Sequence, residues 1–234
     1  MFHFKKFSID DSNAAMKVGT DAVLLGAWAK CENETRILDI GTGSGIIALM
    51  MAQRNHGIPI DAVEIESDAA ELAKQNVLLS PWAGHITIYN DTISKFILQT
   101  IHTYSLIICN PPFFTNSLKT PGKARNLARH NDSLPVTELL DITSRLLSKQ
   151  GKAAFVLPAD AFEYWQEEAV KNNLFPERIT HVKSSPAHKP HRFLVLFSPE
   201  KHAEIIKSEL IIYSSEKIYS FEYQNLTKDF YLNF

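Results

Sequence analysis

The sequence predicts an α/β fold in which a doubly wound, mostly parallel sheet carries helices on both faces. Two observations predict it. Short apolar runs alternate with longer helix-forming runs through most of the chain, which is the pattern of consecutive strand and helix units. A glycine-rich turn at residues 41–45 joins the first of these apolar runs directly to a helix-forming run. Ligands of such sheets bind at the carboxyl ends of the strands, so we expect the site along that edge.

Each element follows from an apolar run and the residues that end it. Residues 36–40 are the first strand, and residues 46–53 continue from the glycine turn as a helix. The helix after the second strand is predicted with Ser67 as its N-cap and Glu71 near the capping-box position. Gly151 is expected to end a later helix. The other predicted strands are residues 60–65, 86–89, 104–109, 153–157, 178–182 and 193–197, and the other predicted helices are residues 67–79, 93–101, 136–147 and 159–172.

Two flanking segments accompany this core. We expect residues 1–30 to be an accessory segment that ends in a helix at 21–29, residues 31–199 to be the core, and residues 200–234 to be an aromatic-rich segment that packs on it. Hydrophobic residues make up 45% and charged residues 21%, and no apolar run is long enough to span a bilayer. Without a secretory signal, a cytoplasmic protein is expected. The two cysteines, Cys31 and Cys109, lack metal-ligand spacing, so neither a disulfide nor a metal site is predicted.

The glycine turn has the composition of a cofactor loop. Gly41, Gly43 and Gly45 allow the backbone to turn sharply and to approach a ligand closely. A nicotinamide fingerprint needs a third glycine where Ile46 stands, and a Walker loop needs a lysine that is absent. The preceding Asp39 suits a ligand with positive charge, because a carboxylate faces a sulfonium or ammonium group favourably. S-adenosylmethionine is such a ligand.

Acidic residues at the ends of the next two strands extend this prediction. Glu64 lies about 20 residues past the glycine turn, where related folds place the acid that binds ribose hydroxyls. Glu66 is a less favoured alternative. Asp91 follows the third strand and has two open interpretations: it accepts from an adenine amino group, or it is the N-cap of the helix that starts near Thr92.

The turn Asn110-Pro111-Pro112-Phe113 follows the apolar run at 105–109. Two consecutive prolines cannot continue a central strand, so the strand must end at Asn110. The Asn110 side chain and the Pro111 carbonyl then offer acceptors beside the ring of Phe113, an arrangement that suits a planar amino group on an aromatic ring. The alternative is an ordinary strand-ending turn with a hydrophobic plug.

Basic residues cluster despite a formal net charge of −2. Neither residues 114–131 nor residues 178–199 contain an acidic residue, and both segments fall where a substrate is expected. The alternative for each is a solvated loop. The candidate phosphate-binding residues are Lys119, Lys123, Arg125, Arg129, Lys189 and Arg192.

Residues 38–46, 62–66 and 110–113 resemble three motifs of class I methyltransferases. Residues 16–28, 80–82 and 229–232 are similar to signatures of the bacterial tRNA1(Val) (adenine-N6) methyltransferase family. This resemblance implies a seven-stranded Rossmann-like sheet with its last strand antiparallel. It also implies methylation of the N6 amine of adenine at position 37, next to the anticodon of tRNA-Val.

The resemblance also implies further site residues and a partner. It adds Lys17, Gly19, Thr20 and Asn110 to the cofactor-binding residues, with tRNA as the partner and a monomer as the expected state. The Asn-Pro-Pro-Phe motif is shared with enzymes that act on guanine N2 and on protein glutamine, so these reactions stay open. A member of a different class, a non-catalytic RNA-binding subunit with this fold, is opposed by the complete set of site residues.

Overall fold

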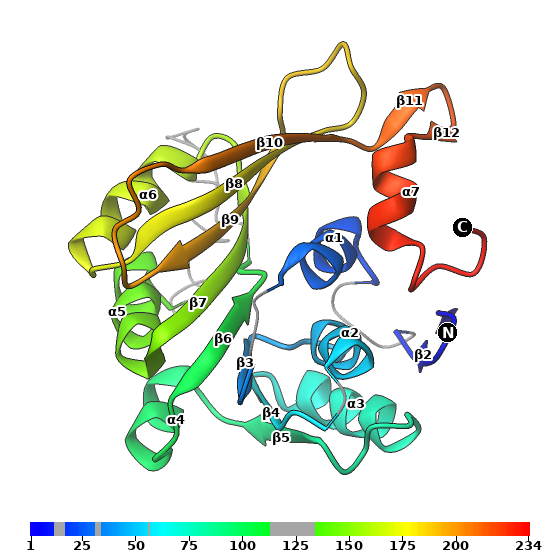
Figure 1. The fold of residues 1–234 in the computed structure, drawn as a ribbon. Coiled ribbons are helices and arrows are strands. Elements are labelled where there is room, and N and C mark those ends of the chain that lie inside the picture. The colour runs from blue at the N-terminus through cyan, green and yellow to red at the C-terminus, as the bar shows by residue number, and fades with distance from the viewer. Residues whose placement is uncertain (12–16, 31–33, 56, 113–133) are drawn as a thin grey trace, which may run out of the picture.

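The computed structural model describes residues 1–11, 17–30, 34–55, 57–112 and 134–234. Its centre is an eight-stranded sheet with the order β10-β8-β9-β7-β6-β3-β4-β5. The strands are β3 (Ile37–Ile40), β4 (Ile60–Glu64), β5 (Ile86–Asn90), β6 (Tyr104–Cys109), β7 (Leu147–Pro158), β8 (Phe175–Lys183), β9 (Arg192–Ser198) and β10 (Ile206–Ile211). All neighbouring strands pair in parallel except that β9 is antiparallel to both β7 and β8. The predicted doubly wound, mostly parallel fold is therefore confirmed (Figure 1).

The prediction of seven strands was one strand short. β10 comes from the segment expected only to pack on the core, and it pairs with β8 at the edge of the sheet. Along β10 only Leu210 is buried, because one side of an edge strand lies open to water. The apolar run that marks a buried strand is therefore absent from this segment.

Helices cover both faces of the sheet. Residues of α1, α2, α3 and α7 pack in one hydrophobic cluster and residues of α4, α5 and α6 in another (Figure 1). Along β6, Leu106 and Ile108 join the first cluster, whereas Ile107 and Cys109 join the second. Strands buried on both faces have continuous apolar sequences, which explains the runs seen in the sequence. The helices are α1 (Thr20–Trp28), α2 (Ile46–Arg54), α3 (Ser67–Leu78), α4 (Ile93–Gln99), α5 (Val136–Leu146), α6 (Phe162–Lys171) and α7 (Phe221–Thr227).

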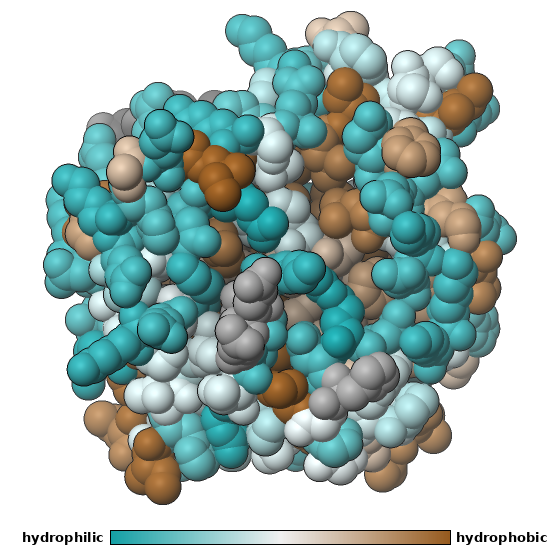
Figure 2. Space-filling model, in the orientation of Figure 1, coloured by the Kyte–Doolittle hydropathy of each residue, from teal (hydrophilic) through white to brown (hydrophobic). Residues whose placement is uncertain are grey.

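The two ends of the chain pack against each other. The Lys5 ammonium donates to the carbonyl oxygens of Lys228 and Phe234 at 2.6 and 2.7 Å. Two small hairpins belong to these ends, β1 (Phe2–His3) with β2 (Ser8–Ile9) and β11 (Tyr213–Ser215) with β12 (Ile218–Tyr219). Figure 2 shows a mostly hydrophilic face, with hydrophobic residues visible in the region of α1 and α7. In the described ranges, no helix is both long and apolar enough to cross a bilayer.

Two predicted boundary residues have other roles. The N-cap of α3 is Glu66, with extended backbone and no side-chain cap, and Ser67 instead lies within hydrogen-bond distance of Asn90, 2.9 Å from hydroxyl to amide oxygen. Gly151 does not end a helix but lies inside β7. A Cβ atom there would lie 2.6 Å from the Tyr104 carbonyl oxygen, so the close approach of β6 requires glycine.

Candidate cofactor and substrate site

The parallel register brings the predicted site residues to one edge of the sheet. Ile40 of β3 is opposite both Val63 of β4 and Cys109 of β6. The residues that follow these three positions, among them Glu64 and Asn110, therefore emerge together at the carboxyl ends of adjacent strands. This is the edge at which ligands of open α/β sheets bind.

The glycine loop has the backbone that only glycine adopts readily. Gly41, Gly43 and Gly45 have φ values of 71°, 56° and 84°. A Cβ atom at Gly41 or Gly43 would meet nothing within 4 Å in the described structure, so this side of the loop has room for a ligand. Gly45 is the N-cap of α2 and lies against Ala73 of α3, where a Cβ atom would be 3.4 Å from the Ala73 Cβ.

Asp39 is a buried carboxylate with one oxygen left over. Its Oδ2 accepts from the Thr42 hydroxyl at 2.5 Å and from the Ala48 backbone N–H at 3.2 Å. Its Oδ1 is buried and accepts no hydrogen bond within the part of the chain that the structure describes. Burial raises the pKa of Asp39 to about 7, against the lowering effect of the two hydrogen bonds. A cationic ligand beside Oδ1 would favour the ionised form.

Glu64 ties the glycine loop to the turn after β4. Its two carboxylate oxygens accept from the backbone N–H groups of Gly43 at 2.8 Å and Glu66 at 3.0 Å. The residue is only 7% exposed, and each carboxylate oxygen keeps a second lone pair for a hydroxyl group. The Glu66 side chain is exposed at the N-cap of α3. The ribose role of Glu64 stays a prediction that this placement supports.

Asp91 lies beside Glu64 but is not the helix cap. The cap of α4 is Thr92, whose hydroxyl accepts from the Lys95 backbone N–H at 3.2 Å. This corrects the interpretation of Asp91 as N-cap by one position. Asp91 accepts from the Thr92 backbone N–H at 2.8 Å and from the Gln99 amide at 3.3 Å. Its own N–H donates to the Glu64 carbonyl oxygen, which holds it at the same edge.

The turn that begins at Asn110, which we call the acceptor turn, starts where β6 ends. Asn110 follows Cys109 directly, Pro111 is buried and Pro112 is exposed. The Asn110 Oδ1 atom is buried and accepts no hydrogen bond from any described residue. Leaving a buried acceptor unpaired costs about 1–3 kcal/mol, so this atom is ready for a donor from a ligand. Phe113 lies outside the described residues.

The N-terminal segment reaches the glycine loop through a residue that the sequence did not indicate. Asn76 of α3 is 2% exposed, and its amide group donates to the carbonyl oxygens of Ser44 and Asp10 at 2.9 and 3.1 Å. Its Oδ1 accepts from the Asp10 backbone N–H at 2.8 Å. An asparagine inside a helix carries no signal for this role, because its partners lie 66 and 32 residues away in the chain.

The three predicted N-terminal cofactor residues follow Asp10, the residue that Asn76 binds, by 7 to 10 positions in the chain. The Lys17 ammonium donates to the Asp11 carbonyl oxygen at 2.7 Å, Gly19 is the N-cap of α1, and Thr20 is the first residue of the helix. The Asp11 carboxylate accepts from the Val18 backbone N–H at 3.2 Å. These contacts fix the position of the start of α1. The cofactor-binding role of Lys17, Gly19 and Thr20 stays a prediction.

The basic residues divide into two groups. Lys119, Lys123, Arg125 and Arg129 lie outside the described residues. Lys189 is exposed in the loop between β8 and β9. Arg192, by contrast, forms an ion pair with Asp21 of α1, 2.9 Å from Nε to Oδ2. The described ranges contain no group of three metal-ligating side chains.

Comparison with known proteins adds independent findings. Residues 12–157 match the model of the methyltransferase small domain. A tRNA1(Val) (adenine(37)-N6)-methyltransferase from Parabacteroides distasonis is 44% identical, covering 99% of this chain and 97% of its own length. The enzyme of the same name from Flavobacterium johnsoniae is 43% identical, covering 99% of both chains. Among solved structures, a predicted O-methyltransferase from Agrobacterium tumefaciens has a TM-score of 0.65 at 16% identity, covering 90% of this chain and 96% of its own.

Proposed function

The chain belongs to the methyltransferase small-domain family and, within it, to the bacterial tRNA1(Val) (adenine(37)-N6)-methyltransferases, and we propose that it methylates the N6 amine of adenine 37 in tRNA-Val with S-adenosyl-L-methionine as donor. The observation that carries the proposal is the buried, unpaired Asn110 Oδ1 at the carboxyl end of β6. An exocyclic amine has N–H donors to give to such an acceptor. Because tRNA is found in the cytoplasm, the proposal places the protein there as well.

The cofactor proposal rests on the glycine loop and the two acids beside it. The loop has positive φ values, there is open space next to Gly41 and Gly43, and the unpaired Asp39 Oδ1 supplies a negative partner for a cationic group. Glu64, held at the end of β4, has lone pairs left for two ribose hydroxyls. S-adenosyl-L-methionine, when bound, supplies an electrophilic methyl group. These residues fit its charge and its hydroxyl groups.

The protein's part in the reaction is placement of the base. The lone pair of an adenine amine is delocalised into the ring, so acceptors that hold both N–H bonds draw the nitrogen toward a pyramidal shape. The Asn110 side chain and the Pro111 carbonyl take this role, and Phe113 stacks on the base for about 1–3 kcal/mol. A base in a stacked anticodon loop must first be flipped out to reach them. The amine's proton then leaves through the acceptor turn to water.

Transfer of labelled methyl groups to tRNA tests this function. With unmodified tRNA-Val, we expect label in N6-methyladenosine at position 37. The variant Asn110→Ala should lower turnover by about 100-fold or more, since misplacing the amine by about 1 Å is that costly, and should leave cofactor affinity nearly unchanged. Asn225→Ala, an exposed asparagine on α7, is the matched control and should keep full activity.

Four results would contradict the proposal. Label in N2-methylguanosine would assign the acceptor turn to guanine, and label in protein glutamine would assign it to a protein substrate. Failure of the purified chain to bind the cofactor in calorimetry would support a non-catalytic RNA-binding subunit. A large loss of cofactor affinity in Asn110→Ala would instead assign Asn110 to cofactor binding or to the structure of the site.

A further inference from the structure

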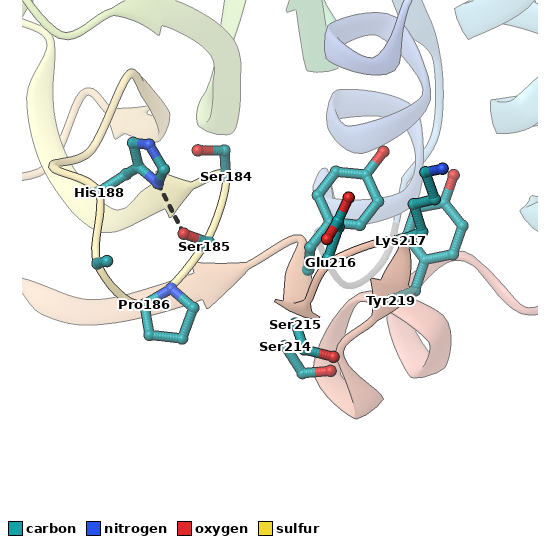
Figure 3. Close-up of a pocket in the computed structure, with 11 residues that line it drawn as sticks. Ser184, Ser185, Pro186, His188, Ser214, Ser215, Glu216, Lys217 and Tyr219 are labelled. Carbon is teal, nitrogen blue, oxygen red and sulfur yellow. Dashed lines mark hydrogen bonds between the residues drawn. The ribbon is translucent and has the colours of Figure 1, made fainter.

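A second ligand-sized opening lies away from the acceptor turn. A cleft of about 790 Å³ separates the loop after β8 from the β11–β12 hairpin (Figure 3). Residues 184–188 form one wall, and residues 213–217 with Tyr219 form the other. We call it the hairpin cleft. Figure 3 shows Ser184, Ser185 and His188 on one side of the opening and Lys217 and Tyr219 on the other.

The hairpin cleft lies on the same edge of the sheet as the acceptor turn. Its first wall follows the carboxyl end of β8, which runs in the same direction as β6 because β9 is antiparallel to both of its neighbours. β8 is three strands and β10 four strands from β6 in the sheet order. At about 4.8 Å per strand, β8 and β10 lie about 14–19 Å from β6 across the sheet, and the cleft, which lies beyond the end of β8, is at least that far from Asn110. A stacked strand of nucleic acid covers that distance with about four to six nucleotides, at about 3.4 Å each.

Aromatic rings and hydroxyl groups line the cleft. Tyr213 and Tyr219 are stacked with ring centroids 4.9 Å apart, and Tyr223 continues the stack at 5.0 Å from Tyr219. On the other wall the Ser185 hydroxyl and the His188 Nδ1 are 2.6 Å apart. Aromatic faces next to hydrogen-bonding side chains are what single-stranded nucleic acids contact through their bases and riboses.

Two lysines are available for phosphate groups, Lys217 in the lining of this cleft and Lys189 directly after its first wall. Lys189, in the loop of the first wall, and Lys217, at the hairpin tip, are exposed, and neither has a carboxylate of the described residues within ion-pair distance. Two nearby basic residues, by contrast, already form ion pairs: Lys183 with Glu209 at 2.5 Å, and Arg192 with Asp21.

Lys217 also adopts a backbone conformation that favours glycine. Its φ is 59°, which costs a residue with a Cβ atom about 1–2 kcal/mol. An exposed, positively charged side chain at such a strained turn supports a contact role. Glu216 is the only acidic residue among those that line the cleft, and it is exposed beside Lys217.

We propose that the hairpin cleft binds a strand of the substrate tRNA at least about four nucleotides away from the base held at Asn110. A base of that strand stacks near Tyr213 and Tyr219, and Lys189 and Lys217 contact the flanking phosphates. The inference rests on the proposed function, because it takes tRNA as the substrate. It adds a contact that secures the RNA while the target base is flipped.

The test compares two charge-removing variants in the full-length protein. Lys189→Gln/Lys217→Gly removes both lysines, and glycine at position 217 suits the positive φ, so the variant should fold at least as well as the wild type. Lys201→Gln is the control. Lys201 is exposed and follows β9, which is antiparallel, so it lies at the amino ends of the parallel strands and away from the cleft. The measurements are the KM for tRNA, kcat, the cofactor Kd and the dependence of tRNA affinity on salt.

We expect the double variant to raise the KM for tRNA about 10-fold, with kcat and the cofactor Kd unchanged. The slope of log affinity against log salt should fall by about 1.5 to 2, which is the loss of two phosphate contacts. Photo-crosslinking of the wild type to tRNA that carries 4-thiouridine should label the peptide of residues 213–219. Lys201→Gln should match the wild type in every measurement.

The remaining outcomes distinguish an error about the hairpin cleft from an error about the proposed function. A wild type that methylates tRNA, together with a double variant that behaves like Lys201→Gln, overturns the hairpin cleft as an RNA site and leaves the proposed function standing. A wild type that methylates no tRNA refutes the proposed function itself. A change in sedimentation with an unchanged KM would assign the cleft to contacts between copies of the chain, and crosslinks confined to other peptides would also overturn the inference.

Discussion

Replacing Asp39 by asparagine should make the protein relatively more stable at high pH and a weaker binder of the cofactor. The carboxylate is fully buried, and only one of its oxygens accepts hydrogen bonds from described residues. Asparagine has the same shape, keeps an oxygen for Thr42 and Ala48, and carries no charge. The substitution therefore removes a buried ionisation while retaining most of the local packing.

The size of the effect follows from the pKa of Asp39, which burial raises from 3.8 to about 7 in the folded protein. Because the folded pKa is the higher one, folding is favoured when the group is protonated, and the wild type loses stability as the pH rises from about 4 to about 7. At about 1.36 kcal/mol per pH unit, that loss is about 4 kcal/mol. The Asp39→Asn variant has no ionisable group at this position, so it should not show this loss.

Urea unfolding between pH 4 and pH 8.5 measures this difference. The unfolding free energy of Asp39→Asn, relative to that of the wild type, should rise by about 4 kcal/mol across the range. The fixed cost of the buried amide cancels in this comparison. Asp68→Asn, an exposed position in the first turn of α3, should show almost no such change. A wild type and an Asp39→Asn variant with parallel pH profiles would refute the reasoning.

Two further substitutions test the framework of the site. Asn76→Ala removes three hydrogen bonds from a buried side chain, so we expect a loss of about 3 kcal/mol in unfolding free energy and a weaker cofactor Kd, whereas the exposed Gln75→Ala should change neither in urea unfolding and calorimetry. Gly151→Ala places a Cβ atom 2.6 Å from the Tyr104 carbonyl oxygen and should cost about 3 kcal/mol, whereas Gly84→Ala meets nothing within 4 Å and should unfold like the wild type.

Features encoded in a few neighbouring residues could be predicted from the sequence. Strands buried on both faces are apolar throughout, and glycines at alternate positions mark the loop after β3. Features that depend on distant contacts could not be predicted. β10 buries only Leu210, and Asn76 acquires its role from Asp10 and Ser44. One of the two open interpretations of Asp91 placed the cap of α4 one residue too early, since Asp91 and Thr92 are both common caps and only the folded chain distinguishes them.

The candidate site contains two buried oxygens that lack hydrogen-bond partners among the described residues, one on β3 and one directly after β6. Asp39 belongs to β3 and Asn110 follows β6, and each has a buried oxygen that accepts no hydrogen bond from the described residues. The two acceptors differ in charge: the Asp39 carboxylate favours a cationic partner, whereas the neutral Asn110 amide favours an N–H donor. The proposed function therefore pairs the cationic cofactor with Asp39 on β3 and the amine with Asn110 after β6, which would place donor and acceptor of the methyl group side by side.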